Sequence, residues 1–399
     1  MLKIRGKVNT AICFAKVIED EAVEQIRRMC DTEMTRGSRI RIMPDVHAGK
    51  GCTIGTTMTI TDKAVPNVVG VDIGCGMYTV RLGNVDIDFA KVDEACRMIP
   101  SGFDTWDRVM WPFDLTGLRC CQELNDAGRL ARSLGTLGGG NHFIEIDRSS
   151  DGAKYLIIHS GSRNLGKQVA EFYQKMAVGL SRGAEEYCAK RDQIIEEYKA
   201  AGRTKEIQRA LEAIRCERNE TDIPDDLCYL SGQPLDDYLH DVVICQSFAR
   251  MNREKMAEVI LEHTGLQAQD AFHTVHNYID TGEMILRKGA IGAHEGELIL
   301  IPINMRDGSI LATGKGNPDW NFSAPHGAGR IMSRSAAKNS IRLDDYIRSM
   351  EGVYTTSVSA DTLDEAPMAY KSLDNIISVI EESVNIIEVL RPIFNYKAG

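Results

Sequence analysis

Residues Asn317–Arg330 read N-P-D-W-N-F-S-A-P-H-G-A-G-R, and the chain has several other loops rich in histidine and glycine. Here His326 is followed at once by Gly-Ala-Gly and then by Arg330. The bare backbone of such a loop lets a phosphate approach its peptide N–H groups closely. A neutral histidine beside the loop can attack phosphorus if a partner holds its other ring nitrogen. A surface turn with an incidental histidine explains these five residues equally well, so the rest of the chain must decide.

Several other apolar runs also end in polar loops that contain glycine. Predicted strands at Ile40–Met43, Tyr78–Leu82 and Tyr155–Ile158 adjoin such loops, and Val68–Val71 is predicted as a strand that leads into Asp72–Met77. Loops held by a rigid sheet are where chemistry usually occurs. The sequence therefore predicts an α+β fold whose strands end in glycine-rich active-site loops.

Helical patterns accompany these strands. Glu21–Cys30 has helical spacing, with Asp20 as its predicted N-terminal cap. Leu235–His263 is predicted as a long amphipathic helix. Residues 331–396 are predicted as helices around a short extended piece, Val353–Val358.

The predicted organisation is a single catalytic domain, residues 1–399, with a helical insertion at about residues 165–270. This insertion is charged and helix-forming, especially over Gln193–Arg218. The length by itself would also allow two or three domains.

The composition is typical of a soluble globular enzyme. Hydrophobic residues make up 43% and charged residues 26% of the 399, which is enough for a large core. No apolar run is long enough to cross a membrane, and the N-terminal segment lacks a signal-peptide pattern. The 11 cysteines are scattered without a C-x-x-C pair, as in proteins whose thiols stay reduced. We therefore expect a cytoplasmic protein with no membrane partner.

The charge balance bears on nucleic-acid binding. A net charge of -10 argues against bulk attraction to nucleic acid, because its phosphates would be repelled. It leaves room for a local basic groove.

Candidate metal ligands stand in several of the loops. A thiolate and a carboxylate, three residues apart, follow the predicted strand at Val68–Val71, and histidines stand in or beside other loops. These candidates are Asp72, Cys75, His142, His159 and one of His273 and His276. Together they form a mixed N/O/S set that suits Mn, Zn or Fe and fits Mg or Ca poorly. Two such metals roughly 4 Å apart are a standard clamp for phosphoryl chemistry. Taken singly, each residue is more often a buried structural cysteine or histidine.

Two glycine-rich motifs point away from common nucleotide folds. Gly161–Gln168 approaches P-loop spacing, but Gln168 stands where a Mg²⁺-binding Ser or Thr is needed. Gly135–Gly140 lacks the G-x-G-x-x-G spacing of a dinucleotide fold. His47, in a polar loop, is a candidate for supporting a ligand rather than binding metal itself.

Taken together, the loops resemble those of the RtcB family of RNA ligases. The resemblance spans nearly the whole chain, in the family's order. The motifs that carry it are Met43–His47, Gly70–Met77, Gly138–Glu145, His159–Arg163, His276–Asn277, Arg287–Ala290 and His326–Arg330. It implies an RtcB-like fold and a ligase that uses GTP and Mn²⁺. Such an enzyme joins an RNA 3′-phosphate, or a 2′,3′-cyclic phosphate after opening, to a 5′-hydroxyl in tRNA splicing or RNA repair.

The resemblance also implies roles for individual residues. His326 would become guanylylated, and Asp72, Cys75, His142, His159 and His276 would hold two Mn²⁺, with Cys75 bridging. The guanylate would be bound by Asn141, His142, Phe143, Glu145, His276, Asn277, Pro302, Met305, Ser309, His326, Gly327, Ala328, Gly329 and Lys397. Arg163, Lys288 and Arg330 would face the RNA phosphate. From its place in the Pro-Asp-Val-His loop, Asp45 is our hypothesis for the group that orients His326.

One loop departs from the usual family pattern. Pro302–Ser309 carries Ile303 and Asn304 where small residues are expected beside the nucleotide. Asn317–Trp320 also differs from the best-known members. Both features resemble a subgroup found beside a peptide-chain-release-factor homologue, which implies that homologue or archease as a protein partner.

Two other functions remain open at this point. The same ligands could serve a dinuclear metallophosphoesterase that uses no covalent histidine. Alternatively, the chain could be an RNA-binding module whose metal is structural, in which case removing the metal would unfold it.

Overall fold

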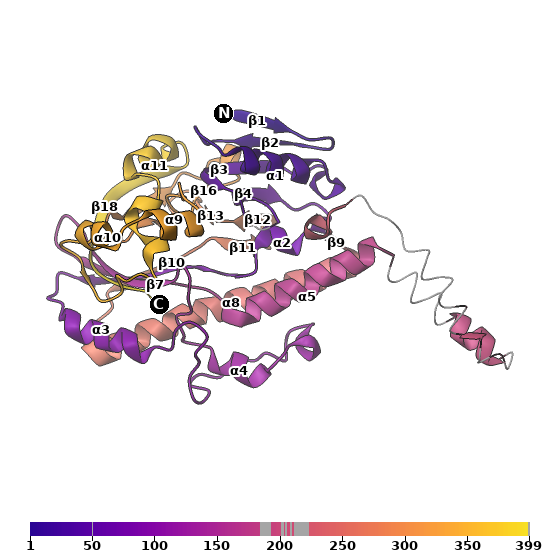
Figure 1. Ribbon diagram of the computed structural model, residues 1–399, viewed down its shortest axis with the longest axis horizontal. Helices are drawn as coiled ribbons and strands as arrows, with labels where there is room; N and C mark the ends of the chain where they lie inside the picture. The colour runs from indigo at the N-terminus through magenta and orange to yellow at the C-terminus, as the bar shows by residue number, and fades with distance from the viewer. Residues whose placement is uncertain are drawn as a thin grey trace.

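The computed structural model describes residues 1–49, 51–183, 193–200, 203, 206–207, 210 and 223–397. Two large sheets lie above a pair of long helices, α5 (Arg163–Ser181) and α8 (Gly232–Thr264) (Figure 1). No helix among the described residues is long and apolar enough to cross a membrane. The expected α+β class is confirmed at this level.

The larger sheet curves until its edges approach each other. Its strands, in spatial order, are β10 (Asp270–Val275), β6 (Gly76–Gly83), β8 (Lys154–Ser160), β7 (Phe143–Arg148), β18 (Val384–Lys397), β15 (Gly308–Gly314) and β14 (Leu298–Asn304), and β17 (Tyr354–Thr355) pairs with β18. The backbone N–H of Leu300 on β14 donates to Thr274 Oγ1 on β10 at 3.1 Å, which links the two edge strands. The result is a nearly closed, antiparallel, barrel-like sheet.

Successive side chains along these strands point to opposite faces of the sheet, and both faces are apolar. Met77, Ile157, Leu311 and Leu390 pack together on the inner face. Their sequence neighbours point outward, where residues such as Ile158 pack against α8 and α3 (Phe89–Met98). Both faces are therefore buried, which fixes the register of the strands that carry the site.

The second sheet has six strands. Their order is β1 (Leu2–Arg5), β2 (Thr10–Cys13), β3 (Ile40–His47), β4 (Ile54–Thr59), β12 (Ile285–Lys288) and β11 (Asn277–Asp280). Two short ladders, β13 (Ala290–Gly292) with β16 (Ser323–Pro325) and β5 (Lys63–Ala64) with β9 (Leu230–Ser231), complete the strands. The amphipathic helix α1 (Asp20–Cys30) buries Ile26 and Met29 in the core beside β1 and β2.

The remaining helices are short. Among the described residues they include α2 (Pro66–Val69), α4 (Ala127–Arg132), α9 (Arg334–Ser340), α10 (Leu343–Ser349) and α11 (Leu373–Ile380). The predicted helix at Glu21–Cys30 is confirmed, but its N-cap position is Glu19, and Asp20 is its first helical residue. The long helix predicted at Leu235–His263 is confirmed as α8. Most of Gln193–Arg218, the helical stretch predicted between α5 and α8, lies outside the described residues.

Two predicted elements are wrong. Val68–Val71 was expected to be a strand, but Val68 and Val69 belong to α2, which begins with Pro66. Proline at the first helical position has a suitable φ and lacks only an N–H that would be unpaired there. The apolar run is thus a buried helical turn, and a loop rather than a strand end carries Asp72.

The C-terminal segment also differs from the prediction. Residues 384–396 were expected to be helical, but they form most of β18, which pairs with both β7 and β15. β-branched and aromatic side chains in this segment favour a strand. Pro392 is accommodated by a register shift between Pro392 and Phe394.

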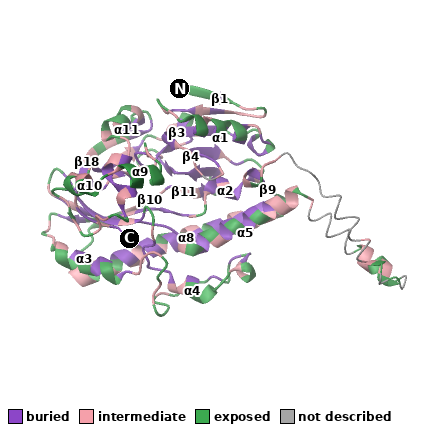
Figure 2. Cartoon of the chain, in the orientation of Figure 1, coloured by how far each residue is buried: buried purple, intermediate pink, exposed green. Residues whose placement is uncertain are grey.

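Polar side chains of α8 support the loops at the sheet's edge. Asn252 is fully buried, and its Oδ1 accepts hydrogen bonds from the backbone N–H groups of Gly135 (2.7 Å) and Thr136 (3.0 Å). Its Nδ2 donates to Thr136 O and Gly161 O, each at 3.1 Å. The neighbouring Arg253 donates to Gly74 O at 2.7 Å and Ser160 O at 2.8 Å. Both are among the buried residues of α8, whose buried parts are purple in Figure 2.

Replacing Asn252 with alanine should therefore destabilise the fold. Buried N–H and C=O groups would lose their partner, and we expect the free energy of unfolding to fall by about 3 kcal/mol. Urea denaturation measures the change. Ser247→Ala, on the exposed face of the same helix, is the control and should change stability by less than about 0.5 kcal/mol. An Asn252→Ala variant as stable as the control would contradict this role.

Candidate active site

Neighbouring strand ends bring four candidate ligands together. In the ladder of β6 and β8, Met77 pairs with His159, so Cys75 stands just before β6 and beside the end of β8. The backbone N–H of His276, just past β10, donates to Cys75 O at 2.9 Å. His142 directly precedes β7, whose Phe143 pairs with His159. Antiparallel pairing thus brings four side chains that are far apart in the sequence into one cluster.

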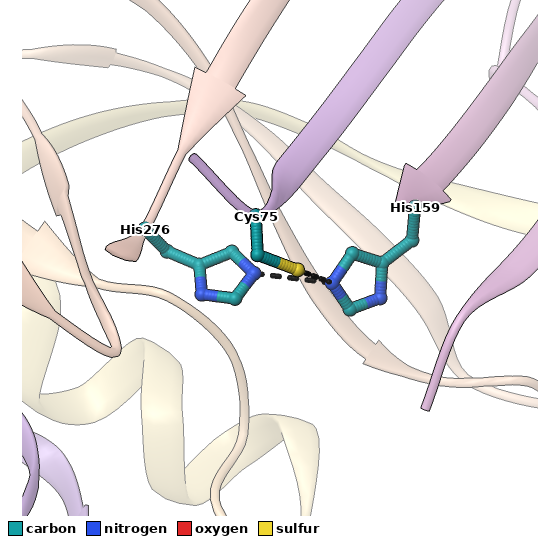
Figure 3. A group of neighbouring side chains, drawn as sticks. All are labelled: Cys75, His159 and His276. Atoms are coloured by element: carbon teal, nitrogen blue, oxygen red, sulfur yellow. Dashed lines mark hydrogen bonds between the residues drawn. The ribbon is translucent and has the colours of Figure 1, made fainter. Parts of the chain in front are cut away.

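The ring nitrogens of this cluster face the thiol. Cys75 Sγ lies 3.3 Å from His159 Nε2 and 3.5 Å from His142 Nε2. His159 Nε2 is 3.1 Å from His276 Nε2 (Figure 3). All four side chains are buried, each no more than 4% exposed.

The hydrogen bonds of the Nδ1 atoms determine which nitrogen of each ring carries the proton and which carries the lone pair. His142 Nδ1 is 2.8 Å from Leu137 O, and His159 Nδ1 is 3.0 Å from Asn141 O. A carbonyl accepts only, so both Nδ1 atoms carry the proton and both Nε2 atoms present lone pairs. Several lone pairs directed at one thiol in a buried space repel one another unless a cation lies between them. The donor set therefore fits metal binding.

Asp72 adds a carboxylate at one end of the cluster. Its Oδ2 is 3.1 Å from His142 Nε2, and its Oδ1 accepts from the Ser162 backbone N–H at 3.0 Å. Burial alone would raise the pKa of Asp72, but in the absence of metal a doubly protonated His142, which can donate to Oδ2, and the charge of Arg163 lower this pKa to about 2. The group is ionised at neutral pH and can bind a cation.

Two overlapping sets of side chains could each hold one ion. Cys75, His159 and His276 form one set, and Asp72, Cys75 and His142 form the other. Cys75 belongs to both, which is the position of a bridging ligand. Burial lowers the pKa of His159 and His276 well below the usual range and raises the pKa of the Cys75 thiol well above it. The imidazoles are thus neutral, the form that binds metal, and the thiol would release a proton on binding.

His326 adjoins the first set. Its ring centroid lies 4.9 Å from that of His276. His326 Nδ1 is 2.7 Å from Oδ2 of the fully buried Asp45, and the His326 backbone N–H donates to the same oxygen at 3.2 Å. A carboxylate accepts, so Nδ1 carries the proton and Nε2 keeps its lone pair. This arrangement is that of an oriented nucleophile.

A cavity of about 240 Å³ opens beside His326. Many of the residues that the sequence assigned to a guanylate line it, namely Asn141, Phe143, Glu145, Pro302, Met305, His326, Gly327, Ala328, Gly329 and Lys397. His142, His276, Asn277 and Ser309 do not form its wall: the first two point into the metal cluster and Ser309 is fully buried. Asn277 Oδ1 accepts from the backbone N–H of Gly289 at 2.9 Å, next to the His326 ring.

Comparison with known proteins agrees with the family resemblance of the loops. Residues 25–111 and 119–398 match the model of a protein family described as "tRNA-splicing ligase RtcB". The chain belongs to the RtcB family. It is 31% identical to the RNA-splicing ligase RtcB of Escherichia coli K12, over 89% of this chain and 88% of that protein. It is 26% identical to the tRNA-splicing ligase RtcB of Thermococcus kodakarensis, over 88% and 86%, and 26% identical to RtcB2 of another E. coli strain, over 95% and 93%.

Membership of the RtcB family makes this chain an RNA ligase that acts in tRNA splicing or RNA repair, and the family uses GTP and manganese. The RNA substrate follows from the same membership. The two alternative functions, a dinuclear metallophosphoesterase and an RNA-binding module with a structural metal, fit this family membership less well than an RNA ligase does.

The three basic residues expected at the RNA phosphate have separate protein partners. Arg163 donates to Gly102 O at 3.0 Å and to Thr136 Oγ1 at 3.2 Å. Lys288 Nζ donates to Asn67 O at 3.0 Å. Arg330 lines the cavity beside His326 and contacts Glu365 and Tyr370 there. Neither Arg163 nor Lys288 lines the cavity that Arg330 lines, and the role of the three residues at an RNA phosphate stays a prediction.

Several residues of the cavity were missed by sequence reasoning. Tyr370, Glu365 and Asn395 line it, together with Arg334 and with His47, which had been assigned only a supporting position. Glu365 accepts from Lys397 Nζ at 2.6 Å and from the Tyr370 hydroxyl at 2.7 Å. They belong to residue types that are common on any surface, and no local motif marks them.

Of the pair left open in the sequence, the structure places His276 in the cluster. The Nε2 of His273 lies 3.1 Å from Glu254 Oε1, and the ring stacks on Tyr78. Strand β10 explains the difference, because His273 lies within it whereas His276 follows its last residue.

Cobalt binding should report the thiolate directly. Co²⁺ bound by a thiolate gives a charge-transfer band in the near ultraviolet, so wild-type protein titrated with Co²⁺ should show one. Cys75→Ser should lose this band, because oxygen replaces the sulfur that belongs to both candidate ligand sets. Cys121→Ser, a half-buried thiol elsewhere, should keep it. A full band in Cys75→Ser would contradict the assignment.

Proposed function

We propose that the chain joins RNA 3′-phosphate or 2′,3′-cyclic phosphate ends to 5′-hydroxyl ends through a guanylylated His326. The observation that carries this proposal is the contact between Asp45 Oδ2 and His326 Nδ1 at 2.7 Å, on the wall of the cavity. This contact commits Nδ1 to Asp45 and leaves Nε2 as the nucleophile.

The reaction proceeds in three displacements, each at phosphorus. His326 Nε2 attacks the α-phosphorus of GTP, a phosphoramidate forms and pyrophosphate leaves. An oxygen of the RNA 3′-phosphate then attacks the same phosphorus, giving an RNA 3′-diphosphate-guanosine and freeing His326. Finally the 5′-hydroxyl loses its proton and attacks the RNA phosphorus, a phosphodiester forms and GMP leaves. A cyclic phosphate is first hydrolysed to the 3′-phosphate.

We assign two Mn²⁺ to the two ligand sets that share Cys75. Bound there, the ions would neutralise phosphate charge and lower the barrier to attack at phosphorus. Asp72, His142, His159 and His276 supply the remaining ligands.

The cavity is suited to a guanylate. Phe143 supplies an aromatic wall, and Lys397 lies with its ammonium 5.8 Å from the centre of that ring. The Gly327–Gly329 segment keeps the backbone bare beside His326. Asn277 and Ser309 would act from just outside the wall.

The unusual Pro302–Ser309 loop has a structural explanation. Ile303 is buried in an apolar cluster, and Asn304 caps the turn: its Oδ1 accepts from the N–H groups of Arg306 and Asp307. Both residues also line the cavity, so they can replace the missing small residues as part of its wall.

Further assignments rest on the sequence. We place Arg163, Lys288 and Arg330 at RNA phosphates, and we assign the chain to the subgroup associated with a release-factor homologue, with that protein or archease as a partner. Residues 1–399 would form one catalytic domain. A cytoplasmic location agrees with the described cysteines, which are all free thiols.

The decisive test of this proposal uses GTP labelled on its α-phosphate. Wild-type protein with Mn²⁺ should retain label, and His326→Ala should retain none. The same wild-type protein should join a 3′-phosphate RNA to a 5′-hydroxyl RNA. Joining without any labelled protein would exclude the covalent histidine.

Asp45→Asn should slow guanylylation of His326. The amide side chain lacks the charge that stabilises the ring as it bonds to phosphorus, and it can donate where Asp45 only accepts. We expect a decrease of about a hundredfold or more, measured as the rate of label incorporation. Asp319→Asn, an exposed carboxylate, is the control. Guanylylation of Asp45→Asn at the wild-type rate would rule out the orienting role.

A further inference from the structure

A loop beside the metal cluster presents an unpartnered aromatic ring to solvent. Phe103 is 91% exposed, the highest exposure of any large apolar side chain among the described residues. The reaction proposed above gives this ring no role. Both faces of such a ring are open to a ligand that reaches this loop.

The loop that carries Phe103, residues 100–106, is held in place by hydrogen bonds along its length. Leu137 N–H donates to Pro100 O at 2.9 Å, and Ser101 forms a bridge with Gly138. Gly102 O accepts from Arg163 at 3.0 Å, and Phe103 O accepts from Arg129. Trp106 Nε1 donates to Gly135 O at 3.2 Å. A ring on so rigid a support loses little entropy when a ligand stacks on it.

This support is the loop that leads to the metal ligands. Gly138 and Gly139, which contact the Phe103 loop, precede Asn141 and His142. Arg163, which holds Gly102, follows Ser162, whose N–H binds the Asp72 carboxylate at 3.0 Å. Phe103 therefore stands at the Asp72 and His142 end of the cluster.

The cluster has a direction. His326 contacts His276, which contacts His159, then Cys75, and finally His142 and Asp72. The guanylate lies at the His326 end. In the last displacement GMP leaves, and an in-line reaction requires the attacking oxygen to enter from the opposite side. The 5′-hydroxyl strand should therefore arrive at the end of the cluster beside Phe103.

We propose that Phe103 stacks on the 5′-terminal base of the 5′-hydroxyl RNA strand and so positions its hydroxyl. This inference rests on the function proposed above. Aromatic stacking tolerates every base, because each has a π-face, and so suits a ligase that must accept different ends. Arg129, which binds the Phe103 carbonyl, is exposed, and Asp104 and Asp107 are exposed on the same loop. The contribution is therefore mainly stacking, with little dependence on salt.

The test compares RNA strands with and without a terminal base. With full-length protein, the KM for a 5′-hydroxyl strand is measured with a normal or an abasic 5′-terminal nucleotide. For wild-type protein the abasic end should raise this KM by about ten- to a hundredfold. In Phe103→Ala the KM for the normal strand should rise by a similar factor, and the abasic end should add nothing further.

Three variants and two other readouts complete the design. Phe103→Trp should restore the wild-type KM and Phe103→Leu should not, while Val109→Ala, exposed on the same loop, is the control. An abasic 3′-terminal nucleotide on the other strand should affect wild-type and Phe103→Ala equally. Label incorporation into His326, which involves no RNA, checks that each variant is folded.

Two outcomes would overturn the inference. One is a Phe103→Ala protein with the wild-type KM, or with the same sensitivity to the abasic 5′ end. The other is a loss of sensitivity that appears only for the 3′-phosphate strand. If wild-type protein takes up label but joins no RNA, the proposed function fails and the inference fails with it.

Discussion

Mutual repulsion of imidazole lone pairs around one thiol is the constraint on which the site depends. The Nδ1–H groups of His142 and His159 donate hydrogen bonds to backbone carbonyls. In the neutral rings the Nε2 atoms then carry no proton and cannot donate to each other or to Cys75. A cation bound between these atoms would remove the repulsion, and the surrounding fold holds the cluster in place. Antiparallel strand ends supply the positions, and Asn252 on α8 supplies the hydrogen bonds that fix the loops.

The cluster also divides the site in two. At one end, His326 and its partner Asp45 adjoin a cavity with an aromatic wall and a bare glycine loop. At the other end, Asp72 adjoins Arg163 and the loops that approach the surface. A nucleotide and a nucleophile can therefore approach one phosphorus from opposite sides, which is the geometry that phosphoryl displacement requires.

The sequence predicted the chemistry better than the fold. Most of the candidate ligands, and His326, stand beside or near glycines in recognisable loops, and family motifs place all of them in order. By contrast, the valines at Val68–Val71 are equally good in a buried strand or a buried turn, and only Pro66 indicated the helix. The long strand β18 was missed because its apolar pattern is also compatible with a helix. Tyr370 and Glu365 reach the cavity through tertiary packing, which no local pattern reveals.

The most direct measurement is anomalous X-ray diffraction at the manganese edge from crystals grown with Mn²⁺. We expect two adjacent peaks, both within bonding distance of Cys75 Sγ, one beside His142 and Asp72 and the other beside His159 and His276. Peaks located away from Cys75, or a cluster that stays unoccupied at saturating Mn²⁺, would contradict it.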